Sequence, residues 1–341
     1  MKVPVSIITG FLGAGKTSLI RHLLETASEK RIGLIINEFG DLGVDLNIID
    51  GCEIKTCDAE NFIELANGCI CCTVADDFLP TMNKLLDQKP SLDHILIETS
   101  GLALPKPLVK AFNWPEVRAG ATVDSVIAVV DSRAVYDGDF SENLLMKEGS
   151  VNTENSLTHD SPLAEVFEDQ VLCADIIVLN KCDLLNQEKQ AQVQNILTSH
   201  KASAAKILKS RFGRVNADLL LGLGAAAEDT LNLRRSHHDG EEDHDHDDFE
   251  SFVFEFGSIS DPKIIEDRLK KIIKKHNILR VKGFVDVLGK EMRNVIQGVG
   301  PRVNSYYDRP WHDYEQRRTS IVIIGLTGLD REAIFDALRA D

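Results

Sequence analysis

Short apolar runs alternate with amphipathic stretches of helix length through the first two thirds of the chain. The runs are rich in Ile and Val and lack polar alternation, which is typical of strands buried on both faces of a parallel sheet. The expected strands are Val5–Thr9, Ile32–Ile36, His94–Ile97, Ser125–Val130 and Ile176–Leu179. The expected helices are Lys16–Ala27, Phe78–Asp87, Pro162–Cys173 and Gln187–His200. A polar insert at Tyr136–Ser161 is expected to be a surface loop. Residues 1–223 therefore predict an α/β domain with a mostly parallel, doubly wound sheet.

The composition changes abruptly after residue 223, first to Ala and Gly and then to an acidic, His-rich stretch. Residues 224–250 are therefore expected to form a flexible linker. The strands expected after it are Ser251–Phe256, Leu279–Leu288, Arg293–Val299 and Ser320–Ile324, with helices at Asp261–His276 and Asp330–Arg339. The first of these helices has a capping Asp261, Pro262 at its first position and one apolar stripe. Residues 251–341 predict a small α+β domain.

Charge excludes two classes of partner. The 341 residues include 38 Lys and Arg against 54 Asp and Glu, so the formal net charge is −16. This excess would repel phosphate backbones and anionic membrane surfaces, so neither nucleic acid nor membrane is expected as a partner. With no apolar run of membrane-spanning length and no clear leader, a cytoplasmic protein is expected. Half of the charge excess lies in residues 237–250, which hold eight acidic residues, four His and no Lys or Arg, and which could collect cations or serve only as a tether.

Residues Gly10–Thr17 match the phosphate-binding pattern G-x4-G-K-[ST], with an apolar run before it and an amphipathic helix after it. Backbone amides of such a loop surround phosphate oxygens at the positive end of the helix. Lys16 is expected to reach the β- and γ-phosphates, and the Thr17 hydroxyl to bind Mg²⁺. The residues expected to contact the nucleotide here are Gly10, Gly13, Ala14, Gly15, Lys16, Thr17 and Ser18.

A second acidic group for the magnesium shell is Glu98, which ends an apolar run. Its contact with Mg²⁺ is expected to be direct or through water. Gly101 follows three residues later and would let a backbone amide approach the γ-phosphate. Lys16 and Glu98 are the expected catalytic residues. The residue that positions the attacking water is left open among Glu98, Asp41 and Asp45.

The motif N-K-x-D at Asn180, Lys181 and Asp183 follows the last apolar run of this domain. An Asp carboxylate in this motif accepts from both N1–H and the exocyclic amine of guanine, and the Asn side chain is expected to meet O6 or N7. Adenine would leave that carboxylate unpaired, so GTP is expected rather than ATP.

Five of the seven cysteines lie between residues 52 and 72, and three of them form C-x-C-C at Cys69, Cys71 and Cys72. Thiolates on one turn can converge on a soft or borderline cation, with Zn²⁺, Co²⁺ and Cu⁺ as candidates. The competing interpretation is three reduced thiols packed in a core. Residues 37–45, with Glu38 and Asp41 as weaker metal candidates, are expected to form a mobile loop near Mg²⁺. Binding of nucleotide and binding of metal are therefore expected to be coupled.

Five motifs together resemble those of the CobW family of SIMIBI-class P-loop GTPases. They are T-G-F-L-G-A-G-K-T at Thr9–Thr17, N-E-F-G at Asn37–Gly40, G-C-I-C-C at Gly68–Cys72, E-T-S-G at Glu98–Gly101 and N-K-C-D at Asn180–Asp183. Arg280–Gly283 is similar to a motif in that family's carboxyl-terminal domain. The resemblance implies a GTPase domain at residues 1–223 and a metallochaperone function with GTP, Mg²⁺ and a divalent cargo as ligands.

Within the family, residues 64–82 and 101–115 are most similar to the members of cobalamin biosynthesis. That similarity implies delivery of Co²⁺ to a cobaltochelatase subunit. Other family members deliver Zn²⁺ to client metalloenzymes, and three thiolates accept both metals. The resemblance also allows a nucleotide-dependent homodimer. Two alternatives are a regulatory GTPase with a structural metal site and a small-molecule kinase, which the guanine motif disfavours.

Overall fold

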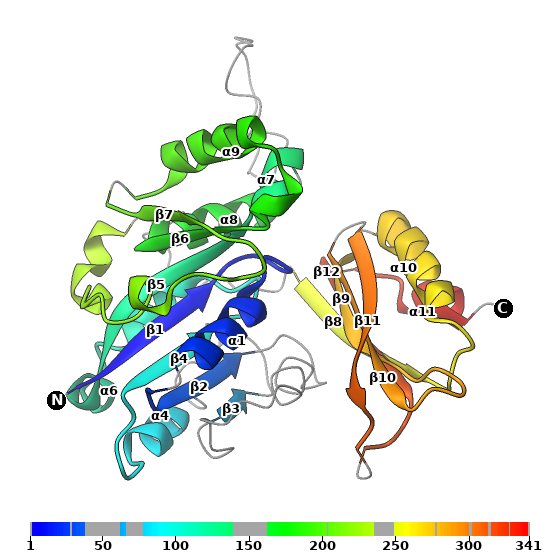
Figure 1. Ribbon diagram of the computed structural model, residues 1–341, viewed down its shortest axis with the longest axis horizontal. Coiled ribbons are helices and arrows are strands. Elements are labelled where there is room, and N and C mark those ends of the chain that lie inside the picture. The colour runs from blue at the N-terminus through cyan, green and yellow to red at the C-terminus, as the bar shows by residue number, and fades with distance from the viewer. Residues whose placement is uncertain are drawn as a thin grey trace. The chain divides into compact units, whose positions relative to one another are not determined.

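The computed structural model describes eleven stretches of the chain. They are residues 2–27, 29–37, 62–65, 78–138, 162–202, 204–234, 249–276, 278–299, 302–312, 315–326 and 328–339. These residues form two compact units, and within the described chain the first unit ends at Arg234 and the second begins at Phe249. Figure 1 labels most of the helices and strands of both units.

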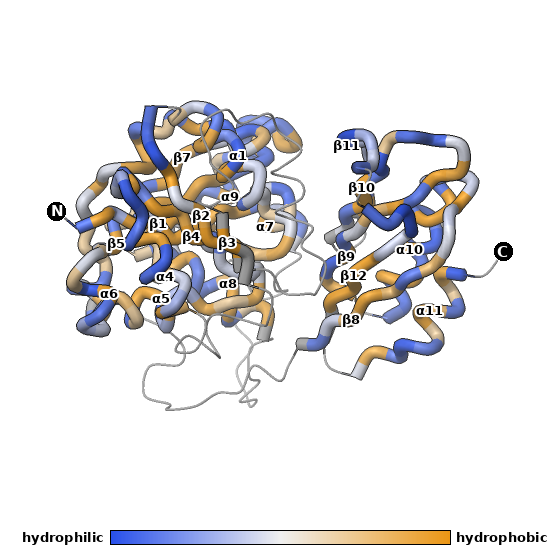
Figure 2. Tube along the Cα trace, turned by 90° about the horizontal axis from the view of Figure 1, so that it is seen from below, coloured by the Kyte–Doolittle hydropathy of each residue, from blue (hydrophilic) through white to orange (hydrophobic). Residues whose placement is uncertain are grey.

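A seven-stranded parallel sheet is the centre of the first unit. Its strands are β1 (Val3–Thr9), β2 (Ile32–Asn37), β3 (Phe62–Leu65), β4 (His94–Glu98), β5 (Ala121–Asp131), β6 (Ile176–Asn180) and β7 (Lys206–Lys209). The order across the sheet is β3-β2-β4-β1-β5-β6-β7, and all neighbours are parallel. Every residue of β4 and β6 is buried, as uninterrupted apolar runs require. Figure 2 shows hydrophobic residues concentrated along these central strands.

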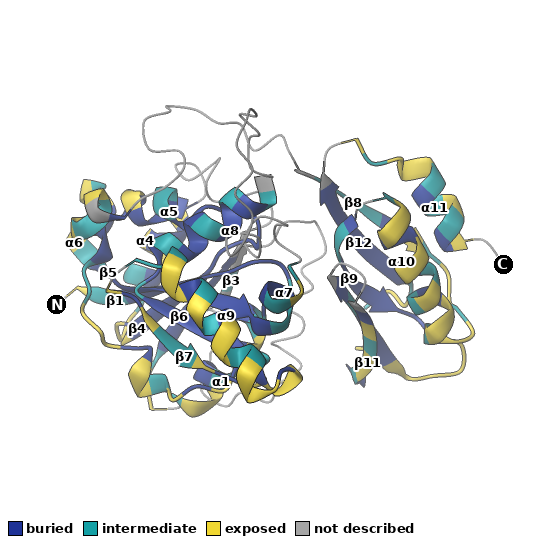
Figure 3. Ribbon diagram, turned by 90° about the horizontal axis from the view of Figure 1, so that it is seen from above, coloured by how far each residue is buried: buried dark blue, intermediate teal, exposed yellow. Residues whose placement is uncertain are grey.

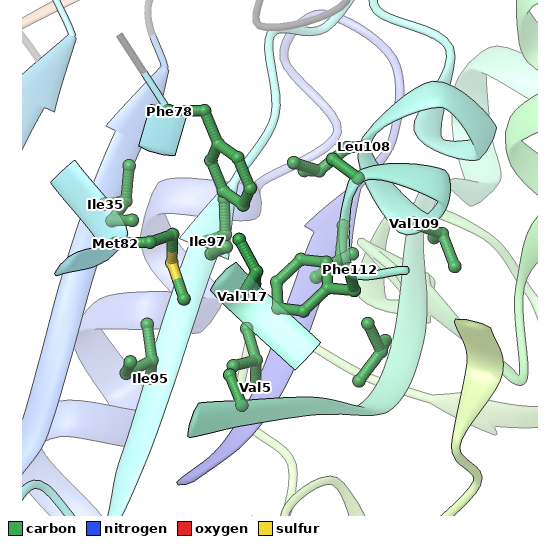
Figure 4. Close-up of a cluster of buried hydrophobic side chains, with 14 of the residues drawn as sticks. Val5, Ile35, Phe78, Met82, Ile95, Ile97, Leu108, Val109, Phe112 and Val117 are labelled. Atoms are coloured by element: carbon green, nitrogen blue, oxygen red, sulfur yellow. The ribbon is translucent and has the colours of Figure 1, made fainter. Parts of the chain in front are cut away.

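Helices connect the strands and cover the sheet. They are α1 (Lys16–Thr26), α4 (Leu79–Leu86), α5 (Pro105–Ala111), α6 (Pro115–Gly120), α7 (Ser132–Asp137), α8 (Pro162–Cys173) and α9 (Gln187–His200). Figure 4 shows one core cluster, in which Phe78 before α4, Met82 within α4 and Phe112 after α5 pack against Val5 and Ile97 of the sheet. Phe78 and Phe112 meet edge to face with their ring centroids 5.6 Å apart.

The strand order determines where a ligand can bind. β1 lies between β4 and β5. The connection from β1 to β2 runs toward one edge of the sheet, whereas the connection from β4 to β5 runs toward the opposite edge. Right-handed crossovers in opposite directions lie on opposite faces of a sheet, which opens a crevice at the carboxyl ends of the strands between them. Residues Thr9, Glu98, Asp131 and Asn180 end β1, β4, β5 and β6 at that edge.

The second unit is an antiparallel sheet with two helices. Its elements are β8 (Phe249–Phe256), α10 (Pro262–His276), β9 (Ile278–Val285), β10 (Met292–Val299), β11 (Arg302–Pro310), β12 (Thr319–Leu326) and α11 (Arg331–Arg339). The strand order is β11-β10-β9-β12-β8. Ile265, Leu269 and Ile273 of α10 are buried in a cluster with Ile334 of α11 and Val281 of the sheet. In Figure 3 the opposite side of α10 is exposed.

β11 was not expected, because its sequence is rich in charged and polar residues. The structure explains its place by an ion-pair cluster. Arg293 of β10 has no exposed surface; it pairs with Asp308 of β11 and, over 3.2 Å, with Glu315. Hydrogen bonds from Arg309 lower the pKa of Glu315 to about 2. Charged residues that the sequence pattern would place at the surface therefore form largely buried ion pairs, which join β10 to β11 and to Glu315.

The expected fold class is confirmed: a parallel P-loop GTPase fold followed by an antiparallel sheet with helices. One boundary was wrong, because residues 224–234 are packed on the first unit rather than forming linker. Glu228 is buried and accepts from Thr122 Oγ1 over 2.6 Å and from the Val123 amide over 2.9 Å, both in β5. Arg234 pairs with Asp175 over 2.7 Å. Among the described residues, none of the helices combines the length and the apolar character that a membrane span requires.

Candidate nucleotide-binding site

The loop between β1 and α1 depends on two glycines with positive φ. Gly10 has φ of 135°, and a Cβ there would lie 2.2 Å from the carbonyl oxygen of Val129 in β5. Gly15 has φ of 106°, and a Cβ there would lie 2.4 Å from Asn180 Nδ2. Both positions therefore exclude any other residue, for reasons of backbone conformation and of space.

Lys16, the first residue of α1, is buried. Its Nζ donates to the carbonyl oxygen of Gly10 over 2.8 Å and lies 3.4 Å from that of Phe11. The ammonium group is therefore held inside the loop, at the amino terminus of a helix whose free amides carry partial positive charge. A buried cation beside such amides can bind a polyphosphate.

Thr17 and Glu98 come together across the same edge. Thr17 Oγ1 lies 3.3 Å from Glu98 Oε1 and 3.5 Å from Oε2. Glu98 is buried at the end of β4, in register with Ile8 of β1 and Ile36 of β2. The hydroxyl and the carboxylate are hard oxygen donors of the kind that Mg²⁺ prefers.

The segment after β4 is packed against the phosphate-binding loop. A Cβ on Gly101 would lie 2.4 Å from Leu12 Cδ2 and 2.8 Å from the Leu12 amide nitrogen. Gln170 of α8, which the sequence did not single out, is buried and donates to the carbonyls of Gly101 over 3.2 Å and Ala103 over 3.1 Å. A helix far along the chain therefore positions the glycine that was predicted to sense the γ-phosphate.

The Asn180 side chain is hydrogen-bonded to backbone on two sides. Its Nδ2 donates to the Ala14 carbonyl over 3.0 Å, and its Oδ1 accepts from the Gly213 amide over 3.0 Å. The side chain joins the phosphate-binding loop to the turn after β7 through both of its polar atoms. Asn180 therefore shapes the site.

The other two residues of N-K-x-D differ in their surroundings: Lys181 forms an ion pair, and Asp183 is exposed. Lys181 has φ of 57°, and its Nζ pairs with Asp131 Oδ2 over 2.7 Å. Asp131 also caps α7 by accepting from the Arg133 and Ala134 amides. Asp183 is exposed in a short 3-10 helix, Cys182–Leu184. An exposed carboxylate at this edge can accept from a planar base.

The turn after β7 is a part of the site that the sequence did not indicate. The Ser210 carbonyl accepts from the Cys182 amide over 3.1 Å, and Gly213 is bound to Asn180. A Cβ on Gly213 would lie 2.7 Å from the Leu19 amide nitrogen in α1. The sequence could have indicated this turn only by its position, because it follows a strand that ends at the same edge of the sheet as the other site residues.

The described cysteines do not bear on metal binding. Cys173 and Cys182 are buried free thiols. Burial raises the pKa of Cys173 to about 12 and also raises that of Cys182, so both stay protonated. The predicted metal residues Cys69, Cys71 and Cys72, and the weaker candidates Glu38 and Asp41, lie outside the described residues. Within the described stretches, no three or more His, Cys, Asp or Glu side chains gather as a metal site.

The chain matches two protein families in succession. Residues 4–208 match "CobW/HypB/UreG, nucleotide-binding domain", and residues 249–340 match "Cobalamin synthesis protein cobW C-terminal domain". A protein of Sinorhizobium named "Zinc chaperone CobW" is 51% identical over 99% of this chain and 97% of its own length. A Pseudomonas aeruginosa protein of the same name is 47% identical over 99% of this chain and 91% of its own length. "Zinc-regulated GTPase metalloprotein activator 1" of Schizosaccharomyces pombe is 34% identical over 69% of this chain and 52% of its own length.

Proposed function

The chain belongs to the CobW/HypB/UreG family of nucleotide-binding proteins, and we propose that it is a metallochaperone that binds a divalent metal ion and delivers it to a client enzyme. The chain is a GTPase. The observation that carries the rest is the combination of a complete phosphate-binding loop, N-K-x-D and C-x-C-C in one chain whose relatives at 51% and 47% identity are named zinc chaperones.

Magnesium would be held by Thr17 and Glu98. Their oxygens lie 3.3 Å apart, and adjacent ligands of an octahedral Mg²⁺ at about 2.1 Å lie about 3 Å apart. The ion would neutralise charge on the β- and γ-phosphates. Lys16 would add a second positive charge, and its Nζ is already oriented by the carbonyl oxygens of Gly10 and Phe11. The arrangement supports phosphoryl transfer to water by position and charge.

Guanine selection is assigned to Asp183. Its carboxylate would accept from N1–H and the exocyclic amine of guanine, and adenine cannot supply that pair of donors. Lys181 would flank the base with its aliphatic stem, because its Nζ is paired with Asp131 Oδ2 over 2.7 Å. Asn180 supports this site indirectly through Ala14 and Gly213.

The cargo is assigned to Cys69, Cys71 and Cys72, with Zn²⁺ as the proposed metal. The names of the relatives support zinc. Three thiolates bind zinc well and leave a fourth position from which a client's ligand could take the ion. Delivery of Co²⁺ to a cobaltochelatase subunit is the competing possibility, because the same thiolates accept cobalt.

The test is competitive loading of the full chain with Zn²⁺ and Co²⁺ at buffered free concentrations, in Mg²⁺-GTP and in Mg²⁺-GDP. We expect zinc to be retained more tightly than cobalt, and more tightly with GTP than with GDP. The variant Cys71→Ser should lose this binding, whereas the matched variant Cys173→Ser, at a buried protonated thiol, should keep it. Preferential retention of cobalt would favour the cobaltochelatase function. Equal retention with both nucleotides would favour a structural metal site.

A further inference from the structure

Phe212 is an exposed aromatic residue in a strained backbone conformation. The residue is 72% exposed, and its φ is 55°. A bulky residue with positive φ is a genuine outlier, since only glycine and a few small polar residues adopt this region readily. A glycine or asparagine would fit this backbone conformation better, so backbone geometry does not account for a phenylalanine at this position.

The residues on both sides of Phe212 are fixed to the nucleotide site. The Gly213 amide donates to Asn180 Oδ1 over 3.0 Å, and Gly213 lies against the backbone of Ser18 and Leu19 in the first turn of α1. On the other side, the Ser210 carbonyl accepts from the amide of Cys182, the third residue of N-K-x-D. The strained residue is therefore positioned between the phosphate-binding helix and the base-reading motif.

An open cavity of about 540 Å³ adjoins this turn, and Phe212, Ser210 and Cys182 are part of its wall. The remaining lining residues are Gln190, Lys209, Arg211 and Arg214, and Asp183 directly follows the lining residue Cys182 in the chain. An aromatic ring that shares a cavity with cationic side chains suits a planar group with acceptor atoms, because the ring can stack on its face while the cations reach acceptors at its edge.

We propose that Phe212 stacks on the guanine base, covering one face of the ring whose hydrogen-bonding edge is read by Asp183. Base–aromatic stacking tolerates any purine, so Phe212 would add affinity while Asp183 supplies the choice of base. The inference rests on the proposed assignment of guanine to Asp183. It gives a reason for an exposed aromatic ring at a residue whose backbone conformation favours glycine or asparagine.

The test compares GDP binding to full-length variants by calorimetry. Phe212→Asn removes the ring but suits the left-handed backbone, and stacking of ordinary strength predicts a dissociation constant raised by roughly 5- to 150-fold. Phe212→Tyr keeps the ring and should bind GDP like the original protein. Leu288→Asn, which removes an equally prominent exposed apolar side chain in the second unit, is the matched control and should bind normally. An unchanged dissociation constant for Phe212→Asn would overturn the proposal.

A second measurement separates stacking from a merely structural role. The indole fluorescence of Phe212→Trp should change on adding GDP and not on adding tripolyphosphate, which has no base. If Phe212→Asn weakens tripolyphosphate binding as much as GDP binding, the turn has lost its shape and the stacking proposal is wrong. Asp183→Asn tests the underlying assignment, since it should shift preference from GDP to xanthosine diphosphate. If that shift occurs while Phe212→Asn binds GDP normally, only the stacking proposal fails.

Discussion

The side-chain amide of Asn180 donates to the carbonyl of Ala14 over 3.0 Å, which joins the end of β6 to the phosphate-binding loop. The same side chain accepts from Gly213 in the turn after β7. One buried amide therefore sets the distance between the part of the site that would hold phosphates and the part that would hold the base. This dependence makes Asn180 a positioning residue for the whole nucleotide.

Asn180→Ala should weaken binding of GDP and of tripolyphosphate together. The substitution leaves the Ala14 carbonyl and the Gly213 amide without their partner, and unsatisfied buried groups cost about 1–3 kcal/mol each. Calorimetric titration with both ligands measures the effect, and thermal unfolding should show a lowered midpoint. Asn186→Ala removes the Asn side chain that caps α9 and serves as the control, with normal nucleotide affinity expected. Loss of GDP binding alone would mean that Asn180 acts on the base instead.

Gly101→Ala should impair GTP hydrolysis through the phosphate-binding loop. A Cβ at this position would lie 2.4 Å and 2.8 Å from atoms of Leu12, so the segment after β4 and the loop must move apart. Steady-state phosphate release should fall by about tenfold or more, the scale expected when catalytic groups are displaced by about 1 Å. Gly257→Ala is the matched control, because a Cβ there meets nothing within 4 Å. Normal turnover in Gly101→Ala would show that this contact is not needed.

The free energy of unfolding should fall as the pH drops from 6.5 to 4. His94 is buried against Ser6 Oγ at 2.9 Å, and burial lowers its pKa from 6.5 to about 4, partly opposed by the charge of Asp124. In that window the unfolded chain binds a proton that the folded chain does not. The free energy of unfolding therefore decreases toward low pH, and the total decrease due to His94 is on the order of 3 kcal/mol. Urea unfolding across this range should show a flatter dependence in His94→Gln, and an identical slope in both proteins would contradict the assignment.

Glu228→Ala should destabilise the first unit by about 2–3 kcal/mol, because it removes the acceptor of both the Thr122 hydroxyl and the Val123 amide. Denaturant unfolding measures the loss. Glu29→Ala, at an exposed carboxylate, should change stability little. If both variants unfold alike, the segment at residues 227–234 contributes nothing to the domain.

The sequence was sufficient for features that depend on local pattern. The uninterrupted apolar runs predicted β1, β2, β4, β5 and β6, because burial on both faces leaves no polar alternation. The phosphate-binding loop was predictable because Gly10 and Gly15 have backbone and packing requirements that glycine alone meets.

Features that depend on distant contacts were not predictable. Gln170 gives no local signal, since its role exists only where α8 meets Gly101. Asn180 was recognised as a site residue, but the partners of its amide come from segments 166 and 33 residues away along the chain. β11 was missed because Asp308 and Arg309 become internal only through their pairing with Arg293 and Glu315.

The most direct test of the account is a single turnover of GTP by the zinc-loaded protein in the presence of a fluorescent zinc chelator. We expect zinc to reach the chelator at the rate of GTP hydrolysis, and we expect the protein to retain its zinc when a non-hydrolysable GTP analogue is bound. Glu98→Gln, which alters the carboxylate beside Thr17, should slow both processes together. Zinc release at the same rate with GTP, with the analogue and without nucleotide would contradict the coupling on which the proposed function depends.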